Sequence, residues 1–316
     1  MTPPQLSIVI VSWNVREPLL RCLQALPAAV EELSYEVIVV DNASEDGTVA
    51  AVQSFFPEVK VKVNQRNLFY AAAANQGLAL ANGSYILLMN PDMLPHPHSI
   101  ARLFRYAEAH PRAGLLGPRI FDARGQDDWR TGREYPTPWS EFVDWSGLAH
   151  LFSFMPFLLK NRRLAYDRGQ SSAVPLLSGA CLLFPPQLPA SLRQFDPGFL
   201  MYGEDIDLCR RIDRARLQKI LVSDARMTHI GGASSKQQPV ITALLAVVAM
   251  NRYFHQWDGR LTAWLHRALM GLISLTKTAV FCTGSVIHAQ WRKRCRIYRR
   301  ILNWAILGAA RNVILG

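Results

Sequence analysis

Polar side chains follow three of the strands that the sequence predicts, at the points where those strands end. In chain order they are Ser12, Asn14, Asp41, Asn42, Asn90 and Asp92. Ligands of an open α/β sheet bind beyond the carboxyl ends of its strands, so we expect these groups to gather at one edge. A hard divalent cation prefers oxygen ligands and binds diphosphate oxygens. Asp92, together with a substrate's phosphates, would hold a cation that stabilises a departing nucleoside diphosphate.

Each of these segments also has a purely structural explanation. Residues 41–47 have the composition of an Asx-rich turn that caps the next helix, and Asn90-Pro91-Asp92 suits a turn because proline fixes φ. Their occurrence at successive strand ends favours a binding site. Neither GxGxxG nor GxxxxGK[ST] follows the first strand, which argues against dinucleotide enzymes and P-loop NTPases.

A second group of acids lies in the segment FDPGFLMYGEDIDLCRR, residues 195–211. Glu204, Asp205 and Asp207 fall in the first turn of a predicted helix, where the helix dipole favours negative charge. Capping would explain one or two of them. Three acids in four positions exceed that need, and packing by the nearby aromatic residues would raise the pKa of one carboxylate and make it a general base.

His229 follows a later strand, in the segment THIGGAS. A single histidine in such a place usually has a structural or surface role. The two glycines behind it would allow the backbone to approach a phosphate closely.

Apolar spacing predicts alternating strands and helices up to Asn90. Continuous β-branched runs indicate strands buried on both faces, and i, i+3, i+4 spacing indicates the helices between them. The expected elements are strands at 7–12, 35–40, 59–63 and 84–89 and helices at 16–33, 48–56 and 70–81. This order predicts an α/β fold with a Rossmann-like, mostly parallel central sheet flanked by helices.

The pattern is less regular after Asn90. We expect helices at 95–114 and 204–215, and strands at 114–121, 176–184 and 218–222. Residues 122–175 are rich in Arg, Trp, Pro and Gly, and we expect a long loop or lid with local helices there.

Positive charge is concentrated at the C-terminal end of the 316-residue chain, whose formal net charge is +11. No acidic residue follows Asp258, but ten basic residues do: Arg260, Arg267, Lys277, Arg292, Lys293, Arg294, Arg296, Arg299, Arg300 and Arg311. Residues 1–258 therefore carry only about +1. A nearly neutral main domain without a nucleic-acid-binding motif argues against nucleic acid as a partner.

The five cysteines are odd in number and widely spaced: Cys22, Cys181, Cys209, Cys282 and Cys295. They form no CxxC pair and no Cys/His cluster, so we expect neither a zinc site nor a disulfide framework. A reducing, cytoplasmic setting fits this pattern.

Residues 256–316 predict a basic tail of amphipathic helices that follows a domain at 1–255. One face of its first helix is largely apolar: Leu261, Trp264, Leu265, Ala268, Leu269, Leu272, Leu275 and Thr276. The other side contains Thr262, His266, Met270, Ser274 and Thr278.

This tail is too interrupted by charge to cross a membrane. Its longest stretch without Lys or Arg, residues 278–291, has fourteen residues, whereas a spanning helix needs ~20. Basic residues beside Trp, Tyr and aliphatic side chains at 291–300 are typical of a helix in the membrane interface. Since each Lys or Arg contributes ~1 kcal/mol at an anionic surface, we expect peripheral attachment to an anionic membrane. A dimerisation helix, and hence a homodimer, is the alternative.

Six segments together resemble the family 2 glycosyltransferases of the GT-A fold, and most closely their rhamnosyltransferase-like branch in bacterial polysaccharide biosynthesis. In order over residues 5–255 they are SIVIVSWN, VIVVDNASEDGT, NQGLALANGSYILLMNPD, SGACLLF, FDPGFLMYGEDIDLCRRI and THIGGAS. The resemblance implies an inverting enzyme at the cytoplasmic face of the cell membrane. It would move rhamnose or a similar hexose from a dTDP- or UDP-sugar to a glycan or polyprenyl-diphosphate-linked acceptor.

The resemblance also implies residue roles. Asp92 would hold Mg²⁺ or Mn²⁺ on the diphosphate, with His229 assisting, and Asp205 would deprotonate the acceptor hydroxyl. One base and one metal are enough for direct displacement at the anomeric carbon. The residues assigned to substrate binding are Ser12, Asn14, Asp41 (on the base or ribose), Asn42, Asn67, Asn90 and Glu204.

Two positions depart from the family pattern. The family's Asn-x-Gly-Phe reads Asn67-Leu68-Phe69-Tyr70 here, and Asn90 replaces the first acid of the DxD motif, so Asp92 must supply the charge. A catalytically degenerate scaffold that binds sugar nucleotides would explain the lost glycine. A nucleotidyltransferase would share the carboxylate–metal site but needs a Gly-rich, basic loop after the first strand, where this chain reads Val15-Arg16-Glu17-Pro18.

Overall fold

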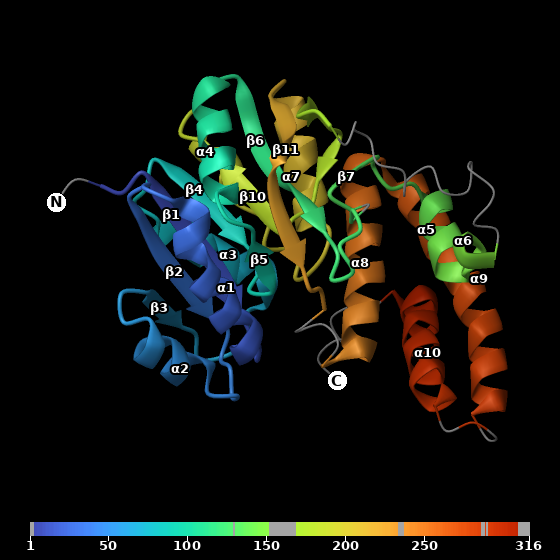
Figure 1. Cartoon of the computed structure of the whole chain (residues 1–316). Helices are drawn as coiled ribbons and strands as arrows, with labels where there is room; N and C mark the ends of the chain where they lie inside the picture. The colour runs from blue at the N-terminus through green and yellow to red at the C-terminus, as the bar shows by residue number, and fades with distance from the viewer. Residues whose placement is uncertain are drawn as a thin grey trace. The chain divides into compact units, whose positions relative to one another are not determined.

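The computed structural model describes residues 3–128, 130–151, 169–232, 237–285, 288 and 290–308. These residues form two compact units (Figure 1). The first contains the described residues within Met1–Glu134, Arg162–Leu200 and Glu204–Ser234, and the second those within Tyr135–Asn161, Met201–Gly203 and Ser235–Gly316.

The first unit is built on one mixed sheet. In sheet order the strands are β3 (Lys60–Val63), β2 (Tyr35–Asp41), β1 (Leu6–Ser12), β4 (Tyr85–Met89), β10 (Cys181–Phe184), β6 (Ala113–Phe121), β11 (Gln218–His229) and β5 (Met93–Pro95), with β8 (Ser172–Ala173) paired to β11. Strands β3, β2, β1 and β4 pair in parallel, as do β6 and β11, whereas β10, β5 and β8 are antiparallel to their neighbours. The predicted α/β fold with a mostly parallel central sheet is confirmed.

Helices cover both faces of this sheet (Figure 1). The helices of the first unit are α1 (Arg16–Val30), α2 (Thr48–Phe55), α3 (Phe69–Leu80), α4 (Ser99–Ala109), α7 (Glu204–Arg214) and the 3₁₀ turn η2 (Ala190–Leu192). Buried apolar residues of α1 and α4 share one core with inward residues of β1, β2 and β4. Helix α3 lies against the opposite face, so the central strands are buried on both sides, as their unbroken apolar runs predict.

Gly77 sets the distance between α3 and the sheet. A Cβ at this position would lie 2.3 Å from Cγ1 of Val9 and 3.1 Å from Cγ2 of Val40. Glycine is therefore required for the helix to pack directly on β1 and β2.

Several predicted boundaries differ from the structure. The expected strand at 176–184 is two strands, β9 (Leu176–Leu177) and β10, separated by a turn at Ser178-Gly179-Ala180, and β9 pairs with β7 (Gly132–Arg133) instead of joining the main sheet. Strand β11 does not stop at 222, because an irregularity between Val222 and Arg226 shifts its register and lets it continue to His229.

The segment expected as a loop or lid, 122–175, holds short elements where it is described. They are β7, α5 (Pro138–Ser146), α6 (Leu148–Leu151) and β8. Residues 129 and 152–168 lie outside the described part.

The second unit is helical. It contains α5, α6, α8 (Pro239–Trp257), α9 (Arg260–Gly284) and α10 (Trp291–Leu307). Leu244 and Val247 of α8 pack with Met270 of α9 and with Ile301 and Trp304 of α10 in one buried cluster. Because α8 shares this core, the second unit begins before the predicted boundary at residue 256. No helix in the described residues has the length and hydrophobicity that a bilayer-spanning segment needs.

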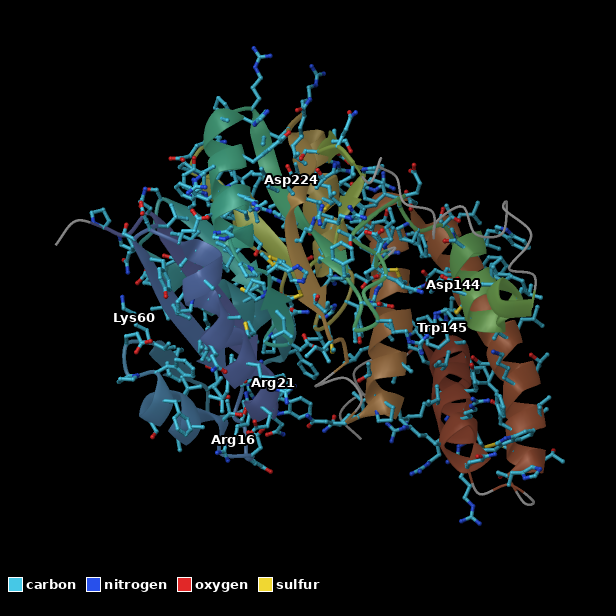
Figure 2. All side chains as sticks on the ribbon, viewed as in Figure 1. Arg16, Arg21, Lys60, Asp144, Trp145 and Asp224 are labelled. Atoms are coloured by element: carbon cyan, nitrogen blue, oxygen red, sulfur yellow. A yellow bond between two sulfur atoms is a disulfide. The ribbon has the colours of Figure 1, made fainter. Side chains whose placement is uncertain are left out.

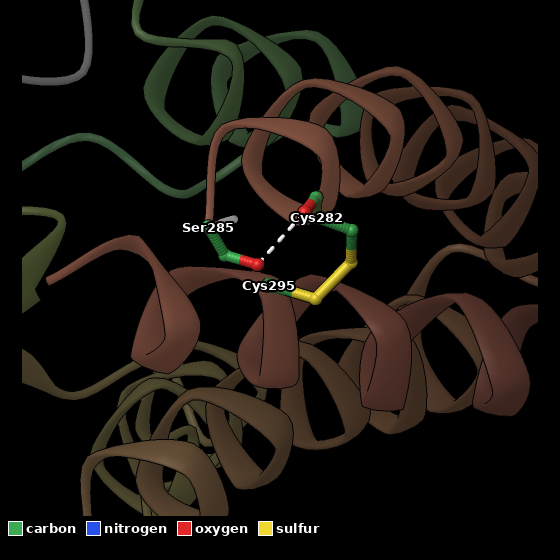
Figure 3. The surroundings of a disulfide bond; sticks show 3 residues. All are labelled: Cys282, Ser285 and Cys295. Carbon is green, nitrogen blue, oxygen red and sulfur yellow. Dashed lines mark hydrogen bonds between the residues drawn. A yellow bond between two sulfur atoms is a disulfide. The ribbon is translucent and has the colours of Figure 1, made fainter. Parts of the chain in front are cut away.

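A disulfide joins α9 to α10, so the prediction that the cysteines form no disulfide is wrong for one pair. Cys282 and Cys295 are bonded, with their Cα atoms 5.0 Å apart, and Ser285 Oγ donates to the Cys282 carbonyl at 2.7 Å (Figure 3). Their spacing of 13 residues gave no recognisable motif; the antiparallel helix pair brings them together. Cys22, Cys181 and Cys209 are free and buried.

Reduction of this disulfide should destabilise the helical unit. Opening a closed loop of this length costs about 3 kcal/mol, because the unfolded chain regains conformational entropy. Urea unfolding followed by circular dichroism, with and without dithiothreitol, measures the effect. A Cys282→Ser/Cys295→Ser double variant serves as the control: it should match the reduced protein and ignore the reductant. Equal stability of the oxidised and reduced wild type would contradict the expectation.

Candidate active site

The end of β11 places His229 beside Asp92. Strand β5 pairs antiparallel with β11 so that Met93 lies opposite His229. Asp92, the residue before β5, therefore reaches the imidazole, and its Oδ1 lies 3.1 Å from Nε2 of His229. The Ile230 amide also donates to the Asp92 carbonyl at 3.1 Å. Asp92 is only 5% exposed, so this carboxylate–imidazole pair is held in a fixed position.

The turn before Asp92 is held from both sides. The Asn90 amide donates to the Ala180 carbonyl at 2.9 Å, and the Met93 amide donates to the Asn90 carbonyl at 3.2 Å. The backbone of Asn90 thus holds the turn that positions Asp92, as the structural explanation of Asn90-Pro91-Asp92 predicts. The Asn90 side chain is half-buried.

Asp41 organises the loop that follows β2. Its carboxylate accepts hydrogen bonds from the Ser44 amide at 2.8 Å and the Ser44 hydroxyl at 2.6 Å. Ser44 Oγ in turn accepts from the Asn14 amide, and Asn14 Oδ1 accepts from the Glu45 amide at 2.7 Å. Asn14 needs a positive φ of 50° to make this link. The ends of β1 and β2 therefore form one rigid loop pair.

Two further residues border this loop pair. Ser12 is fully buried and its hydroxyl has no hydrogen-bond partner among the described residues. The Arg16 amide donates to Asp46 at 2.9 Å, which fastens the start of α1 (Arg16 is labelled in Figure 2) to the same loop.

Asn42 links the ends of β2 and β3 to the start of α3. Its Oδ1 accepts from Asn64 Nδ2 at 2.9 Å, and its Nδ2 donates to the Phe69 carbonyl at 3.1 Å. Asn67 Oδ1 accepts from the Phe69 amide at 2.8 Å. Two asparagine side chains therefore hold the backbone of Phe69 on both sides.

Phe69 has a backbone conformation that glycine adopts readily and other residues rarely adopt. Its φ is +63°, in the left-handed region that favours glycine and costs a side-chain-bearing residue roughly 1–2 kcal/mol. The contacts from Asn42 and Asn67 offset that cost. The departure from Asn-x-Gly-Phe thus changes the side chain but leaves the main chain of the loop in a glycine-like shape.

The three acids at the start of α7 have different environments. Asp207 is fully buried and paired with Arg211 Nε at 2.8 Å, so it is bound within the helix. Asp205 is half-buried, and its carboxylate accepts from the Gly179 and Ile206 amides. Glu204 is 7% exposed, and its Oε2 has no hydrogen-bond partner among the described residues. Burial and the neighbouring Asp205 charge raise the pKa of Glu204 to about 8, so Glu204 is protonated at neutral pH.

Gly179 and Tyr70 connect these acids to the rest of the site. Gly179 donates its amide to Asp205 Oδ2 at 3.0 Å and accepts at its carbonyl from the Tyr70 hydroxyl at 3.3 Å. A Cβ at Gly179 would lie 3.0 Å from Cβ of Asp205, so glycine permits the close approach. Desolvation, followed by the charges of Glu204 and Asp205 and more weakly Asp92, raises the pKa of Tyr70 well above its ordinary value. The residue after Gly179, Ala180, accepts from the Asn90 amide, so this segment connects the acids of α7 to the turn that holds Asp92.

Sequence reasoning missed both residues as site members, although each lies in a quoted motif. Tyr70 occupies the last position of the Asn-x-Gly-Phe motif, and an aromatic side chain there would usually be assigned to the hydrophobic core. Gly179 belongs to SGACLLF, which was expected as a strand. The turn between β9 and β10 brings Gly179 to Asp205, and the apolar sequence around it gave no sign of a turn.

Asp128 and Arg130 are two more residues that the sequence did not single out. Asp128 is buried and accepts a two-pronged hydrogen bond from Arg130, with Nη2 at 2.6 Å from Oδ2. Desolvation opposes ionisation of Asp128, but Arg130, and to a smaller degree the charge of His229, lower its pKa. The Asp128 amide donates to the Ile120 carbonyl at 2.9 Å, and Ile120 pairs with Met227 of β11, so Asp128 lies near the strand end that holds His229.

The donor set of Asp92 and His229 suits a divalent cation in part. A carboxylate oxygen fits Mg²⁺ or Mn²⁺, and an imidazole nitrogen fits Mn²⁺ better than Mg²⁺. In the described part of the chain no three His, Cys, Asp or Glu side chains gather as a metal-binding group. A cation here would thus take its remaining ligands from substrate phosphates or water.

Known glycosyltransferases are similar to this chain in sequence. The model of glycosyl transferase family 2 matches residues 7–181, more than half of the chain. The N-acetylglucosaminyl-diphospho-decaprenol L-rhamnosyltransferase of Mycobacterium tuberculosis is 30% identical over 247 residues, which cover 74% of this chain and 78% of the relative. The uncharacterized glycosyltransferase YfnE of Bacillus subtilis is 31% identical over 121 residues, 36% of this chain and 31% of YfnE.

A solved structure shares the fold. The mannosyltransferase PcManGT from Pyrobaculum calidifontis, in complex with GDP-Man and Mn²⁺, superposes with a TM-score of 0.53 over 99% of this chain and 88% of its own, at 15% identity. The sheet, its flanking helices and the family match together identify the architecture as GT-A. The chain belongs to glycosyl transferase family 2.

Proposed function

We propose that this protein is an inverting hexosyltransferase that moves a sugar, rhamnose or a close relative, from a dTDP- or UDP-sugar to a polyprenyl-diphosphate-linked acceptor in cell-surface polysaccharide synthesis. The observation that carries the proposal is the Asp92–His229 pair, in a chain that resembles a rhamnosyltransferase over most of its length. The segment that holds Asp205 through Gly179 also accepts, at Ala180, the Asn90 amide of the Asp92 turn. That relative's name specifies a diphospho-decaprenol acceptor.

The nucleotide half of the donor belongs to the loops that Asp41 and Asn42 organise. Those loops lie at the carboxyl ends of β1 and β2, where an open sheet binds nucleotides. Asn14, Ser44 and Phe69 are half-buried in these loops, and residues 45–47 are exposed beside them. The rigidity of these contacts supports a preformed donor site.

The diphosphate belongs to Asp92 and His229. They would hold Mg²⁺ or Mn²⁺, which when bound supplies positive charge against the charge that develops on the leaving diphosphate. The charged side chains that we assign to this site are mainly carboxylates, so a diphosphate needs such compensation.

Asp205 is the general base in this proposal. Its carboxylate takes the proton of the acceptor hydroxyl while that oxygen bonds to the anomeric carbon. The bond from that carbon to the diphosphate breaks, and the displacement inverts the configuration. Gly179 and Ile206 fix the carboxylate by their amides, and Asp207 is excluded because Arg211 holds it. Protonated Glu204 adds no second charge beside the base and can donate a hydrogen bond to substrate.

We place the reaction at the cytoplasmic face of the cell membrane, with the protein attached peripherally. A polyprenyl-linked acceptor is confined to the bilayer, so an enzyme that uses it gains from surface binding. The Cys282–Cys295 disulfide does not support this location, because disulfides are rare in reducing compartments. The proposed location rests on the acceptor chemistry and the basic tail.

Asp92→Ala should weaken donor binding. Removing the carboxylate that would hold the cation should raise the dissociation constant for a dTDP- or UDP-sugar by at least about tenfold in the presence of Mn²⁺, and abolish the difference between Mn²⁺ and chelator. Isothermal titration measures both. Asp224→Ala, an exposed acid elsewhere on β11, is the control and should bind as wild type. Metal-dependent binding by the Asp92 variant would refute the assignment.

Asp205→Asn should remove turnover and leave the donor bound. Loss of a general base lowers kcat by roughly 10²–10⁴-fold, and the amide keeps the size of the side chain. Donor affinity, measured by the same titration, should remain within about twofold of wild type. This variant also separates the enzyme from a sugar-nucleotide-binding scaffold, because a scaffold has no turnover to lose. Normal turnover would show that another group is the base.

Glu204→Gln should stabilise the protein at alkaline pH. The pKa of Glu204 rises from an ordinary 4.5 to about 8 on folding, so the unfolded state loses this proton at lower pH than the folded state does. Stability should therefore fall as pH rises from 4.5 to 8, and glutamine, which stays neutral, should remove that fall. Melting temperatures of wild type and variant between pH 4 and pH 9 test this; parallel curves would mean that Glu204 is ionised in the folded protein.

A further inference from the structure

Helix α9 exposes a continuous apolar face in addition to the residues that it buries. Six large apolar side chains on it are between 45% and 78% exposed: Leu261, Trp264, Leu265, Leu272, Leu275 and Val280. Ala268, Thr276, Ala279 and Thr283 are exposed between them. These ten residues recur at three- and four-residue spacing along seven turns, and none is charged. We call them the α9 outer face.

The inward side of α9 combines core residues such as Met270 and Ile273 with polar residues that would normally face solvent. His266 and Ser274 are fully buried, and Asn251 of α8 contacts His266 Nδ1 at 3.3 Å. Burial lowers the pKa of His266 to about 3, so its ring is neutral at physiological pH. The orientation is therefore fixed by packing within the helical unit.

Two of the three basic residues of α9, Arg267 and Lys277, also turn away from the outer face, and the third, Arg260, is the first residue of the helix. Arg267 donates to the carbonyls of Ala305 and Ile306, which end α10 without helical partners. Lys277 donates to the carbonyl of Trp145, near the end of α5 (Trp145 is labelled in Figure 2), at 2.7 Å. Both charges satisfy helix ends of the same unit, and the outer face is left wholly uncharged.

Helix α10 adds an exposed basic side to the same helical pair. Its exposed charged residues are Arg292, Lys293, Arg294, Arg296 and Arg299. No acidic residue occurs from Arg260 to Leu307. The disulfide holds the basic end of α10 against α9, so the apolar face and the basic side form one rigid element.

We infer that the α9 outer face inserts into the interface of an anionic lipid bilayer, with the basic residues of α10 at the headgroup phosphates. An apolar face of this size on a soluble surface indicates a partner, and the adjoining cations select an anionic one. A second copy of the chain is disfavoured as the occupant, because pairing through α9 would bring two acid-free, basic helix pairs together. The inference deepens the membrane location proposed above and does not depend on the transfer chemistry.

Vesicle partition tests the surface. The triple variant Trp264→Ser/Leu272→Ser/Leu275→Ser should sediment with vesicles of equal parts phosphatidylglycerol and phosphatidylcholine roughly tenfold or more weakly than wild type. These side chains are exposed, so the variant should keep the wild-type melting temperature. Phe55→Ser, which removes an exposed aromatic residue from the first unit, is the matched control and should bind normally.

Charge and orientation are tested separately. Changing Arg292, Arg296 and Arg299 to Gln should remove the preference for phosphatidylglycerol, whereas changing Arg21, Lys62 and Arg112, exposed in the first unit, should not.

The emission of an environment-sensitive fluorophore on Ala268→Cys should shift to the blue on vesicle binding, and the emission of one on His255→Cys of α8 should not. The native cysteines are buried or bonded and do not compete for label.

Three outcomes would overturn the inference. The first is unchanged vesicle binding by the triple variant. The second is an equal fluorescence shift for labels at positions 268 and 255. The third is a wild-type dimer in gel filtration that becomes a monomer in the triple variant while vesicle binding is unchanged. If the wild-type protein turns over substrate but does not bind vesicles, the membrane inference fails and the proposed reaction stands. If it binds vesicles but shows no turnover, the proposed reaction fails and the membrane inference stands.

Discussion

The short antiparallel pairing of β5 with the end of β11 is the contact on which the candidate site depends. It is three residue pairs long, yet it joins two segments 137 positions apart and sets Asp92 against His229. The irregularity in β11 near Val222 and Arg226 is what carries that strand far enough to reach β5. If β11 ended where its apolar run ends, His229 would lie in a loop and Asp92 would lack its partner.

Burial then differentiates acids that the sequence presents as equivalent. Glu204, Asp205 and Asp207 occupy one helical turn, but only Asp207 meets an arginine, and only Glu204 is buried with an unpartnered oxygen. Asp205 remains half-exposed and held by backbone amides, which suits a group that must accept a proton from substrate. Gly179 binds the Asp205 carboxylate and the next residue, Ala180, accepts from the Asn90 amide, so this short segment connects the α7 turn to the Asp92 turn.

Much of the sheet could be predicted because its central strands are apolar on both faces, and no other element explains a run such as SIVIVS. The strand-end positions of Asp41 and Asp92 followed from that pattern. Contacts that depend on tertiary pairing could not be predicted. The turn at Gly179, the length of β11 and the Cys282–Cys295 bond all arise from segments far apart or from geometry without a sequence motif. The amphipathic pattern of α9 was visible, but which side faces the core required its neighbours.

The product of one reaction tests the central claim most directly. Purified protein is incubated with dTDP-, UDP- and GDP-sugars, Mn²⁺ and a polyprenyl-diphosphate-linked sugar, and the glycan formed is examined by NMR for its anomeric configuration. The account predicts acceptor-dependent release of nucleoside diphosphate from one of the dTDP- or UDP-sugars and a linkage of configuration opposite to the donor's. A product with retained configuration, or donor binding with no acceptor-dependent release from any of these sugars, would contradict it.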